Sequence, residues 1–303
     1  MTSTLRRMPG YLGLAVILAG LSGCAHQQHG ATAEVPAGSA TADLDTRTGA
    51  IALPIEAYTL AKTDDDEMNT AISIRMSACA AERGVDFRPT PVMSDVSDVA
   101  SNFFGVWIPK YAEKFGFVPP NSNADLAANG VKGAPHVVLH GIPSLRHNGT
   151  LTDAEWKVVD ACRDEAPELN SDVVAPQGPW VRPAQDAENA ALGSKAAKEV
   201  ESDYDACLTS KGLEPDPESP GFVKGADVHT ISPQQIALAL KVVDCKTQVH
   251  YVQRLTSLIA NAQAPIVAKY HQELVAQRQR IDAALVKAKK VIADYQRDHP
   301  EFT

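Results

Sequence analysis

Hydrophobic residues recur at spacings of three and four over several long stretches of the chain, which is the period of α-helices that bury one face. The first stretch predicts a helix from Thr63 to about Arg83. Its acidic start suits the free N–H groups and the positive dipole end of a helix, and Gly84 ends it. A calcium loop is the other interpretation of the acidic run, but the alternating spacing and glycine turn of such loops are missing. The predicted apolar face consists of Met68, Ile72, Met76 and Cys79.

Two further helix patterns lie in the middle of the chain. One begins at Thr152, where Glu155 three residues later completes a capping box. The other predicts one continuous helix over residues 184–211, which Gly212 closes.

The C-terminal third predicts two long helices. The first begins at Ser232-Pro233, an N-cap followed by a proline at the first helical position, and Pro265 is expected to break or kink it. The second runs to about Arg297 and fits a helical hairpin or a short coiled coil. We expect its stripe to pack internally, on the preceding helix, rather than dock a partner. The stripe residues, seven apart, are Val267, Leu274, Ile281, Ala288 and Tyr295.

Composition agrees with a folded helical chain. The 303 residues are 44% hydrophobic and 21% charged, which excludes wholesale disorder. The best strand signal is the single short segment His136–His140, so we predict an all-α fold. The net charge of −9 lacks the basic footprint of a nucleic-acid-binding protein, and we expect no nucleic-acid partner.

The N-terminus has the pattern of a bacterial lipoprotein signal peptide. Arg6 and Arg7 precede a ten-residue apolar run, Leu12–Leu21, which is too short to span a membrane. The run ends in Leu-Ser-Gly-Cys, which resembles a lipobox, so Cys24 is the predicted lipid attachment site. An ordinary signal peptide with a chance cysteine is the alternative. The protein is therefore expected to be exported and anchored to the cell membrane by its lipid, facing outside the cytoplasm.

The predicted organisation has four parts. Residues 1–23 form the signal peptide, and the small polar residues of 24–52 form a flexible tether. Residues 53–180 form a first half with helices and an aromatic loop, and 181–303 form a second helical half that ends in the long helix.

Four cysteines of the body lie on apolar faces of predicted helices, and an oxidising compartment favours disulfides between them. Two of them share the form C-x4-G at a helix end, and the other two follow the similar runs KVVDAC and KVVDC. This weak internal repeat makes pairing within each repeat the simplest, although the two other connectivities remain open. No two cysteines have the close spacing of a structural zinc site. The favoured pairs are Cys79 with Cys162 and Cys207 with Cys245.

The lipobox and four further stretches of the chain resemble segments of a known protein family. The four stretches are MSACAAERGVDF, FFGVWIPKYAEKFGFVPP, YDACLTSKG and ALALKVVDCKTQ. In this arrangement the chain resembles a family of actinobacterial envelope lipoproteins with no assigned catalytic residues. The resemblance covers most of residues 55–295 loosely. Family members are often encoded near ABC transporter components and peptidoglycan-binding adaptors. The resemblance therefore implies an accessory role beside a transporter or a peptidoglycan-associated partner.

Six of the 17 aromatic residues fall within one 15-residue segment. Rigid aromatic side chains serve as anchors for a ligand or a partner, but a local core beneath a long loop is the interpretation that we favour. The six residues are Phe103, Phe104, Trp107, Tyr111, Phe115 and Phe117.

Catalytic and metal-binding motifs are weak. His136 and His140 are four apart, but their segment is predicted to be extended, which separates the two rings. Ser144 follows, without the G-x-S-x-G elbow of serine hydrolases. We therefore expect no metal, no cofactor and a non-catalytic accessory or partner-binding lipoprotein. The alternatives are a binder of a small ligand or cell-wall fragment that uses the aromatic segment, and a cell-wall hydrolase.

Overall fold

The structure is a computed structural model that describes residues 41–91, 104–119, 132, 143–169, 171–219 and 221–302. The described residues belong to one compact unit of the chain, residues 35–303. The signal peptide, Cys24, Phe103, His136 and His140 lie outside the described residues.

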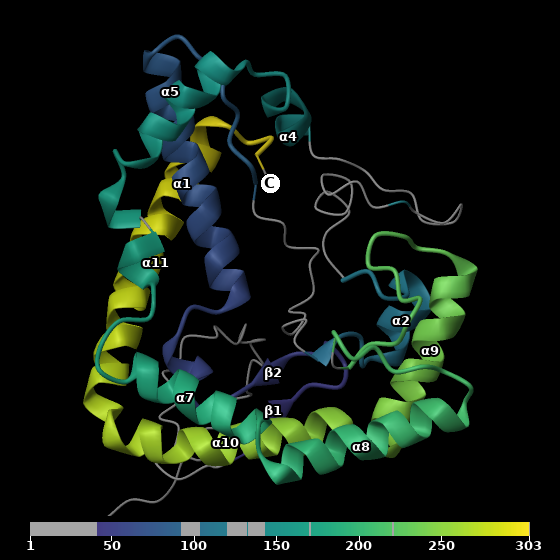
Figure 1. Ribbon diagram of the computed structural model, residues 1–303. Helices are drawn as coiled ribbons and strands as arrows, with labels where there is room; N and C mark the ends of the chain where they lie inside the picture. Colours follow the sequence, from purple (N-terminus) through teal and green to yellow (C-terminus); the bar gives the residue numbers. More distant parts are fainter. Residues whose placement is uncertain are drawn as a thin grey trace, which may run out of the picture. The chain divides into compact units, whose positions relative to one another are not determined.

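The described chain is mainly helical, which confirms the all-α prediction (Figure 1). Its only sheet within these residues is a two-stranded antiparallel hairpin. The elements are β1 (Asp43–Leu44), β2 (Ile51–Ala52), η1 (Glu56–Tyr58), α1 (Lys62–Glu82), α2 (Pro109–Phe115), α4 (Pro143–Asn148), α5 (Asp153–Arg163), η3 (Pro167–Leu169), α6 (Ser171–Val174), α7 (Val181–Leu192), α8 (Lys195–Ser210), α9 (Pro233–Gln248), α10 (Tyr251–Lys269) and α11 (His271–Asp298).

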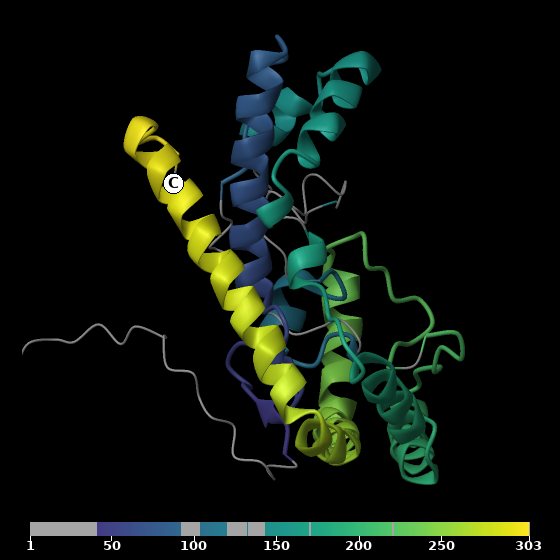
Figure 2. The same ribbon diagram turned by 90° about the vertical axis from the view of Figure 1, so that its left-hand side faces the viewer.

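The long C-terminal helix α11 packs against α1, which it crosses at an angle (Figures 1 and 2). Leu274, Ile281 and Ala288 of its stripe are fully buried, so the stripe is internal as expected. Its main packing partner is α1 and not the preceding helix α10, because α10 is occupied along its length by α7 and α8. Sequence periodicity identifies the buried face of a helix but not the element that covers it.

The largest hydrophobic core lies among α8, α9 and α10. Helix α9 also packs against α2, and α10 packs against α7 and α8 (Figure 1). The segment between Phe104 and Val118 therefore contacts α9 although about 120 residues separate them in the chain, and Val223 fills the same core.

Two of the predicted helices are divided. The single helix expected over 184–211 is broken at Gly193, and Ser194 restarts it by accepting a hydrogen bond from the Ala197 N–H at 3.1 Å. The helix expected from Ser232 is broken at His250, which adopts a left-handed conformation with φ 53°. Pro265, which was expected to break or kink the helix, does not break it and lies inside α10. A helix tolerates one missing N–H donor when its neighbours hold it in place.

The end of the predicted tether is structured. Within residues 24–52, which were expected to be flexible, β1 pairs with β2 so that Leu44 faces Ile51. Both side chains pack against the main core, and burying them stabilises a hairpin that is too short to be stable alone. The flexible-tether prediction is therefore wrong for this hairpin.

Both favoured disulfide pairings are present. Cys79 on α1 joins Cys162 on α5, with Cα atoms 5.8 Å apart. Cys207 on α8 joins Cys245 on α9, with Cα atoms 5.6 Å apart. The capping box at the start of α5 is also present as predicted, and so is the serine cap of α9.

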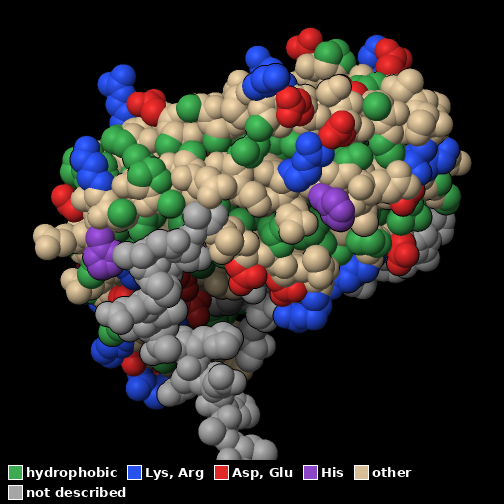
Figure 3. Space-filling view, turned by 90° about the horizontal axis from the view of Figure 1, so that it is seen from below, with side chains coloured by type: hydrophobic (Ala, Val, Ile, Leu, Met, Phe, Trp, Pro, Cys, Tyr) green, Lys and Arg blue, Asp and Glu red, His purple; other side chains and the backbone are tan. Residues whose placement is uncertain are grey.

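The face shown in Figure 3 carries acidic, basic and hydrophobic side chains in alternation, without a field of one charge sign. Among the described residues, no helix is both long enough and apolar enough to cross a membrane.

Candidate functional site

The predicted aromatic segment forms much of the contact between α2 and α9. Phe104 and Phe117 are buried in the main core, and Tyr111 and Phe115 are buried in a smaller cluster beside it. These four rings pack inside the protein, as in the favoured local-core interpretation. Trp107 differs because it is only half-buried.

Lys246 attaches this segment to α9. The residue is 3% exposed, and its Nζ donates hydrogen bonds to the backbone carbonyl oxygens of Phe104 and, at 3.0 Å, Val106. The backbone between these two carbonyls lies close to the amine and to the Phe222 ring. A Cβ on Gly105 would lie 3.2 Å from the Lys246 Nζ and 3.0 Å from the Phe222 ring. The amine thus fixes the backbone that leads into Trp107. We call this arrangement the lysine clamp.

Three aromatic rings surround the amine of the lysine clamp. The Nζ lies 5.8 Å from the ring centroid of Tyr204 and 5.9 Å from those of Phe222 and Tyr251. Tyr204 and Tyr251 come from α8 and α10, and their ring centroids are 4.7 Å apart. The Tyr204 hydroxyl donates to the Gly221 carbonyl at 3.1 Å. Ring faces attract a cation, so they favour the protonated amine.

Burial opposes that preference. Loss of water lowers the pKa of Lys246 to about 7, and the same desolvation raises the pKa values of Tyr204 and Tyr251. In the described part of the chain, no carboxylate forms an ion pair with Lys246. A buried charge normally has an ionic partner, and this amine has only carbonyl oxygens and ring faces.

A pocket of about 310 Å³ opens beside the lysine clamp. Its walls come from the β1 region, from the aromatic segment, from the end of α9 and from the first turn of α10. Apolar groups, including the Trp107 ring, share the walls with a few polar ones. The lining residues are Leu44, Thr46, Trp107, Ile108, Pro109, Lys246, Thr247, His250, Val252 and Gln253.

The wall from α10 has two unusual features. His250 precedes the helix in a left-handed conformation, which a histidine adopts at some energetic cost. The first turn of α10, which contributes Val252 and Gln253 to the pocket, has no side-chain cap. Free N–H groups and the positive end of the helix dipole therefore lie at this wall.

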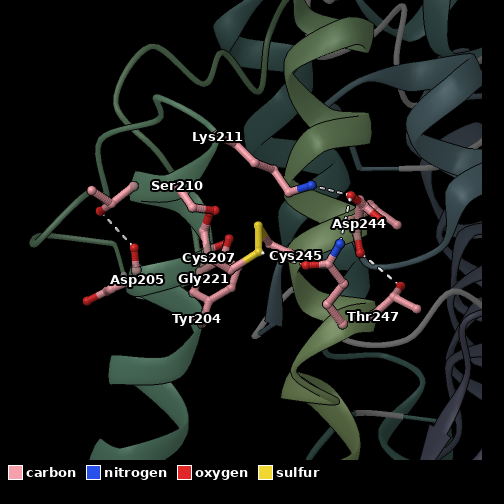
Figure 4. The surroundings of a disulfide bond; sticks show 12 residues. Tyr204, Asp205, Cys207, Ser210, Lys211, Gly221, Asp244, Cys245 and Thr247 are labelled. Atoms are coloured by element: carbon pink, nitrogen blue, oxygen red, sulfur yellow. Dashed lines mark hydrogen bonds and ion pairs between the residues drawn. A yellow bond between two sulfur atoms is a disulfide. The ribbon is translucent and has the colours of Figure 1, made fainter.

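The second disulfide holds the helices that carry this site. Figure 4 shows the bond between Cys207 and Cys245, with Lys211 reaching across it to the carboxylate of Asp244. Lys246 is the residue after Cys245. The covalent bond and the ion pair fix α8 against α9, and so fix the Tyr204 ring relative to the amine.

Part of this site is predictable from sequence patterns. They indicate Trp107 and the two cysteines, but they do not indicate Lys246, Tyr204, Phe222 or Tyr251 as members. A signal for Lys246 is present, since it lies four residues after Val242 and three before Val249, within the apolar stripe of α9. A lysine within such a stripe indicates a buried amine that needs partners.

Other sequence candidates fall elsewhere. Ser144 lies in the short helix α4, and the histidines considered with it, His136 and His140, lie outside the described residues. Within the described ranges, no group of three or more acidic, histidine or cysteine side chains is arranged to hold a metal ion.

No known protein family, curated protein or solved structure matches the chain.

Proposed function

We propose that this protein is a non-catalytic, lipid-anchored protein of the bacterial envelope whose helical body binds a small apolar molecule in the pocket beside Trp107. The observation that carries the proposal is the pocket itself. Its walls come from four separate parts of the chain. The buried amine ties two of them together, the aromatic segment and α9, and a disulfide fixes α9 to α8. Such fixation reduces the entropy that binding would otherwise lose.

The volume and lining of the pocket suit a small ligand. About 310 Å³ is at the lower end of the range typical of small-molecule sites, which are mostly apolar with a few placed polar groups. At roughly 30 Å³ per water-sized unit, the space accepts about ten non-hydrogen atoms. Trp107, half-buried at the wall, supplies a rigid aromatic surface for such a molecule.

The described surface offers less support for a protein partner. Val286 is the one large hydrophobic side chain counted as exposed among the described residues, at 70%. The resemblance to envelope lipoproteins nevertheless implies an accessory role beside a transporter or a peptidoglycan-associated protein. Crosslinking in cells, followed by mass spectrometry of attached proteins, tests that role independently of the pocket.

Extraction of bound molecules tests the pocket. The full-length protein is purified from its own membrane in detergent, washed and extracted, and the extract is analysed by mass spectrometry. We expect a small molecule from the wild type that is absent from Trp107→Arg, because the guanidinium would occupy the pocket wall. Trp156→Arg is the matched control, since Trp156 is also half-buried but packs on Phe87 elsewhere. Equal extracts from the wild type and Trp107→Arg would refute the proposal.

Lipid labelling tests the anchor. Cells fed a lipid analogue should label the wild type, because Cys24 follows an apolar signal run in a lipobox-like tetrapeptide. Cys24→Ala should lose the label, and Ser22→Ala, which keeps the cysteine, should retain it. Persistent label on Cys24→Ala would contradict lipid attachment at this residue.

A further inference from the structure

Lys246 is one of the residues that line the pocket, and no carboxylate of the described chain forms an ion pair with its buried amine. Its two hydrogen-bond acceptors are the neutral carbonyls of Phe104 and Val106. Carbonyls and ring faces solvate an ammonium only in part, so the protonated form remains costly in this position. An anionic group placed in the pocket would supply the missing partner.

A second wall of the pocket adds to this preference. The first turn of α10 lines the pocket without a side-chain cap, so the positive end of a 19-residue helix faces the same space. The remaining lining is mainly apolar, with the Trp107 ring and the side chains of Leu44 and Val252. The pocket therefore combines an apolar volume with two sources of positive potential.

From this geometry we infer that the pocket takes a small molecule with an apolar body and one carboxylate, and that the carboxylate pairs with Lys246. A single ammonium balances a single negative charge, which favours a carboxylate over a doubly charged phosphate. The inference rests on the proposed function, because it specifies the ligand class of the same pocket.

Pairing with a carboxylate has a consequence for the proton on Lys246. Because burial holds the pKa of the free amine near 7, a large fraction of it is neutral at pH 8, and an anion nearby favours the charged form. Binding should therefore draw a proton from the solution. The titratable groups that face the amine are Tyr204 on α8 and Tyr251 on α10, and the raised pKa values of both phenols keep them neutral at this pH. His250 is the other ionisable side chain in the pocket wall.

Calorimetry with a matched set of probes tests the inference. Full-length protein in detergent is titrated at pH 8 with 3-phenylpropanoate, 3-phenylpropanol and 3-phenylpropylamine, in two buffers of different ionisation enthalpy. Empty micelles provide the background. We expect the carboxylate to bind about tenfold or more tightly than the alcohol, in line with hydrogen bonds to charged groups, and the amine to bind most weakly. Of the three probes, only the carboxylate should cause the protein to take up a proton on binding, and the comparison of the two buffers measures this uptake.

Two variants locate the effect. Lys246→Met should abolish the proton uptake and the preference for the carboxylate over the alcohol. His250→Asn removes the other ionisable group of the pocket, and asparagine tolerates the left-handed backbone, so this variant should keep both properties. Proton uptake by the unmodified protein does not depend on whether Lys246→Met folds.

The outcomes separate the inference from the proposed function. Equal binding of alcohol and carboxylate, without proton uptake, overturns the carboxylate assignment and leaves the ligand pocket in place. Proton uptake that survives in Lys246→Met but is lost in His250→Asn also overturns it. Failure of every probe to bind, together with an empty extract from the native protein, refutes the proposed function itself.

Discussion

Cys79 joins α1 to α5 and Cys207 joins α8 to α9, and the first helix of each pair ends three residues after its cysteine. Both ends have the same backbone geometry. The Val85 N–H donates to the Ala80 carbonyl at 2.9 Å, and the Leu213 N–H donates to the Leu208 carbonyl at 3.0 Å. This is the Schellman arrangement, with a glycine of positive φ at the turn.

The ion pairs beside the two disulfides also correspond. In the first pair, Arg83 follows the end of α1 and contacts Glu165 beyond α5. In the second, Lys211 follows the end of α8 and contacts Asp244 on α9. Each basic residue lies four positions after its cysteine. Its ion pair is a second link between the two chain segments that the disulfide joins.

The two regions differ at the residue that follows the second cysteine. Arg163 is exposed, with 63% of its side chain accessible, whereas Lys246 is buried and holds the aromatic segment. The first region closes its core with Phe87 against Trp156 and forms no lysine clamp. Similar local sequence thus produces similar local structure, while the pocket depends on a segment from elsewhere in the chain. Five expectations test this division.

Removing each disulfide should have the largest effect. Closing loops with sequence separations of 83 and 38 residues accounts for about 4.5 and about 4 kcal/mol of stability in the chain-entropy treatment. We expect the double Ser variants of Cys79/Cys162 and Cys207/Cys245 to lose comparable stability in urea unfolding. Only the second should lose probe binding under conditions in which both remain folded. Loss of binding in the first variant alone would contradict the assignment of the pocket to the second region.

The first region can also be weakened through α11. Ile281 is fully buried against the core that α11 shares with α1, so Ile281→Asp should cost about 3 kcal/mol or more. Val286→Asp on the same helix is the control, and at 70% exposure it should change the free energy of unfolding by about 0.5 kcal/mol or less. Equal losses from both would show that the stripe of α11 is not an internal face.

Corresponding residues of the repeat provide the next comparison. Lys246→Met leaves the Phe104 and Val106 carbonyls without their donor, and we expect a loss of about 2 kcal/mol. Arg163→Met removes an exposed side chain and should change stability by about 0.5 kcal/mol or less. Urea unfolding of both variants measures the difference. An unchanged stability in Lys246→Met would contradict the lysine clamp.

The pH dependence of stability in the wild type and in Lys246→Met gives a finer test. The pKa of Lys246 is about 7 in the folded protein, below the value of about 10.4 in an unfolded chain, so the unfolded state binds more protons between these values. Stability from this residue therefore rises with pH in that window, by at most about 1.4 kcal/mol per pH unit. We expect the wild type to gain stability relative to Lys246→Met from pH 7 to about 9.5. Above that range the raised pKa values of Tyr204 and Tyr251 make the stability of both proteins fall as the pH rises, so the comparison ends there. A constant difference would contradict the lowered pKa.

The smallest expected effects are at the two glycines. A Cβ on Gly84 or Gly212 meets no atom within 4 Å, so Gly→Ala at either position costs only the positive φ, about 1 kcal/mol. Thermal unfolding of both variants should show similar decreases in Tm. A clearly larger decrease at one position would mean that the two helix ends are not equivalent.

Local signals in the sequence predicted local structure well. The capping box at Thr152, the serine cap at Ser232 and the glycine stop at Gly84 each depend on residues within a few positions, and each is present. The break at His250 has no glycine or proline to signal it, and Pro265 lies inside a helix that its neighbours support. These departures follow from tertiary packing, which local patterns do not contain.

At the candidate site, too, local sequence patterns predicted burial but not the contacts between distant parts of the chain. Burial of the aromatic rings agreed with the local-core interpretation, but the role of Lys246 depends on carbonyls about 140 residues earlier in the chain. Its position in the apolar stripe signals burial without naming a partner. The partner of α11 is likewise non-local, since α1 precedes it by about 200 residues.

Fluorescence of Trp107 alone is the most direct test of the pocket. Changing Trp156 and Trp180 to Phe leaves a single tryptophan at the pocket wall. Titration of the full-length protein with 3-phenylpropanoate should shift the Trp107 emission to shorter wavelength and saturate, because the ligand displaces water from the ring. Binding that calorimetry detects while Trp107 emission stays unchanged would place the ligand elsewhere and contradict the account.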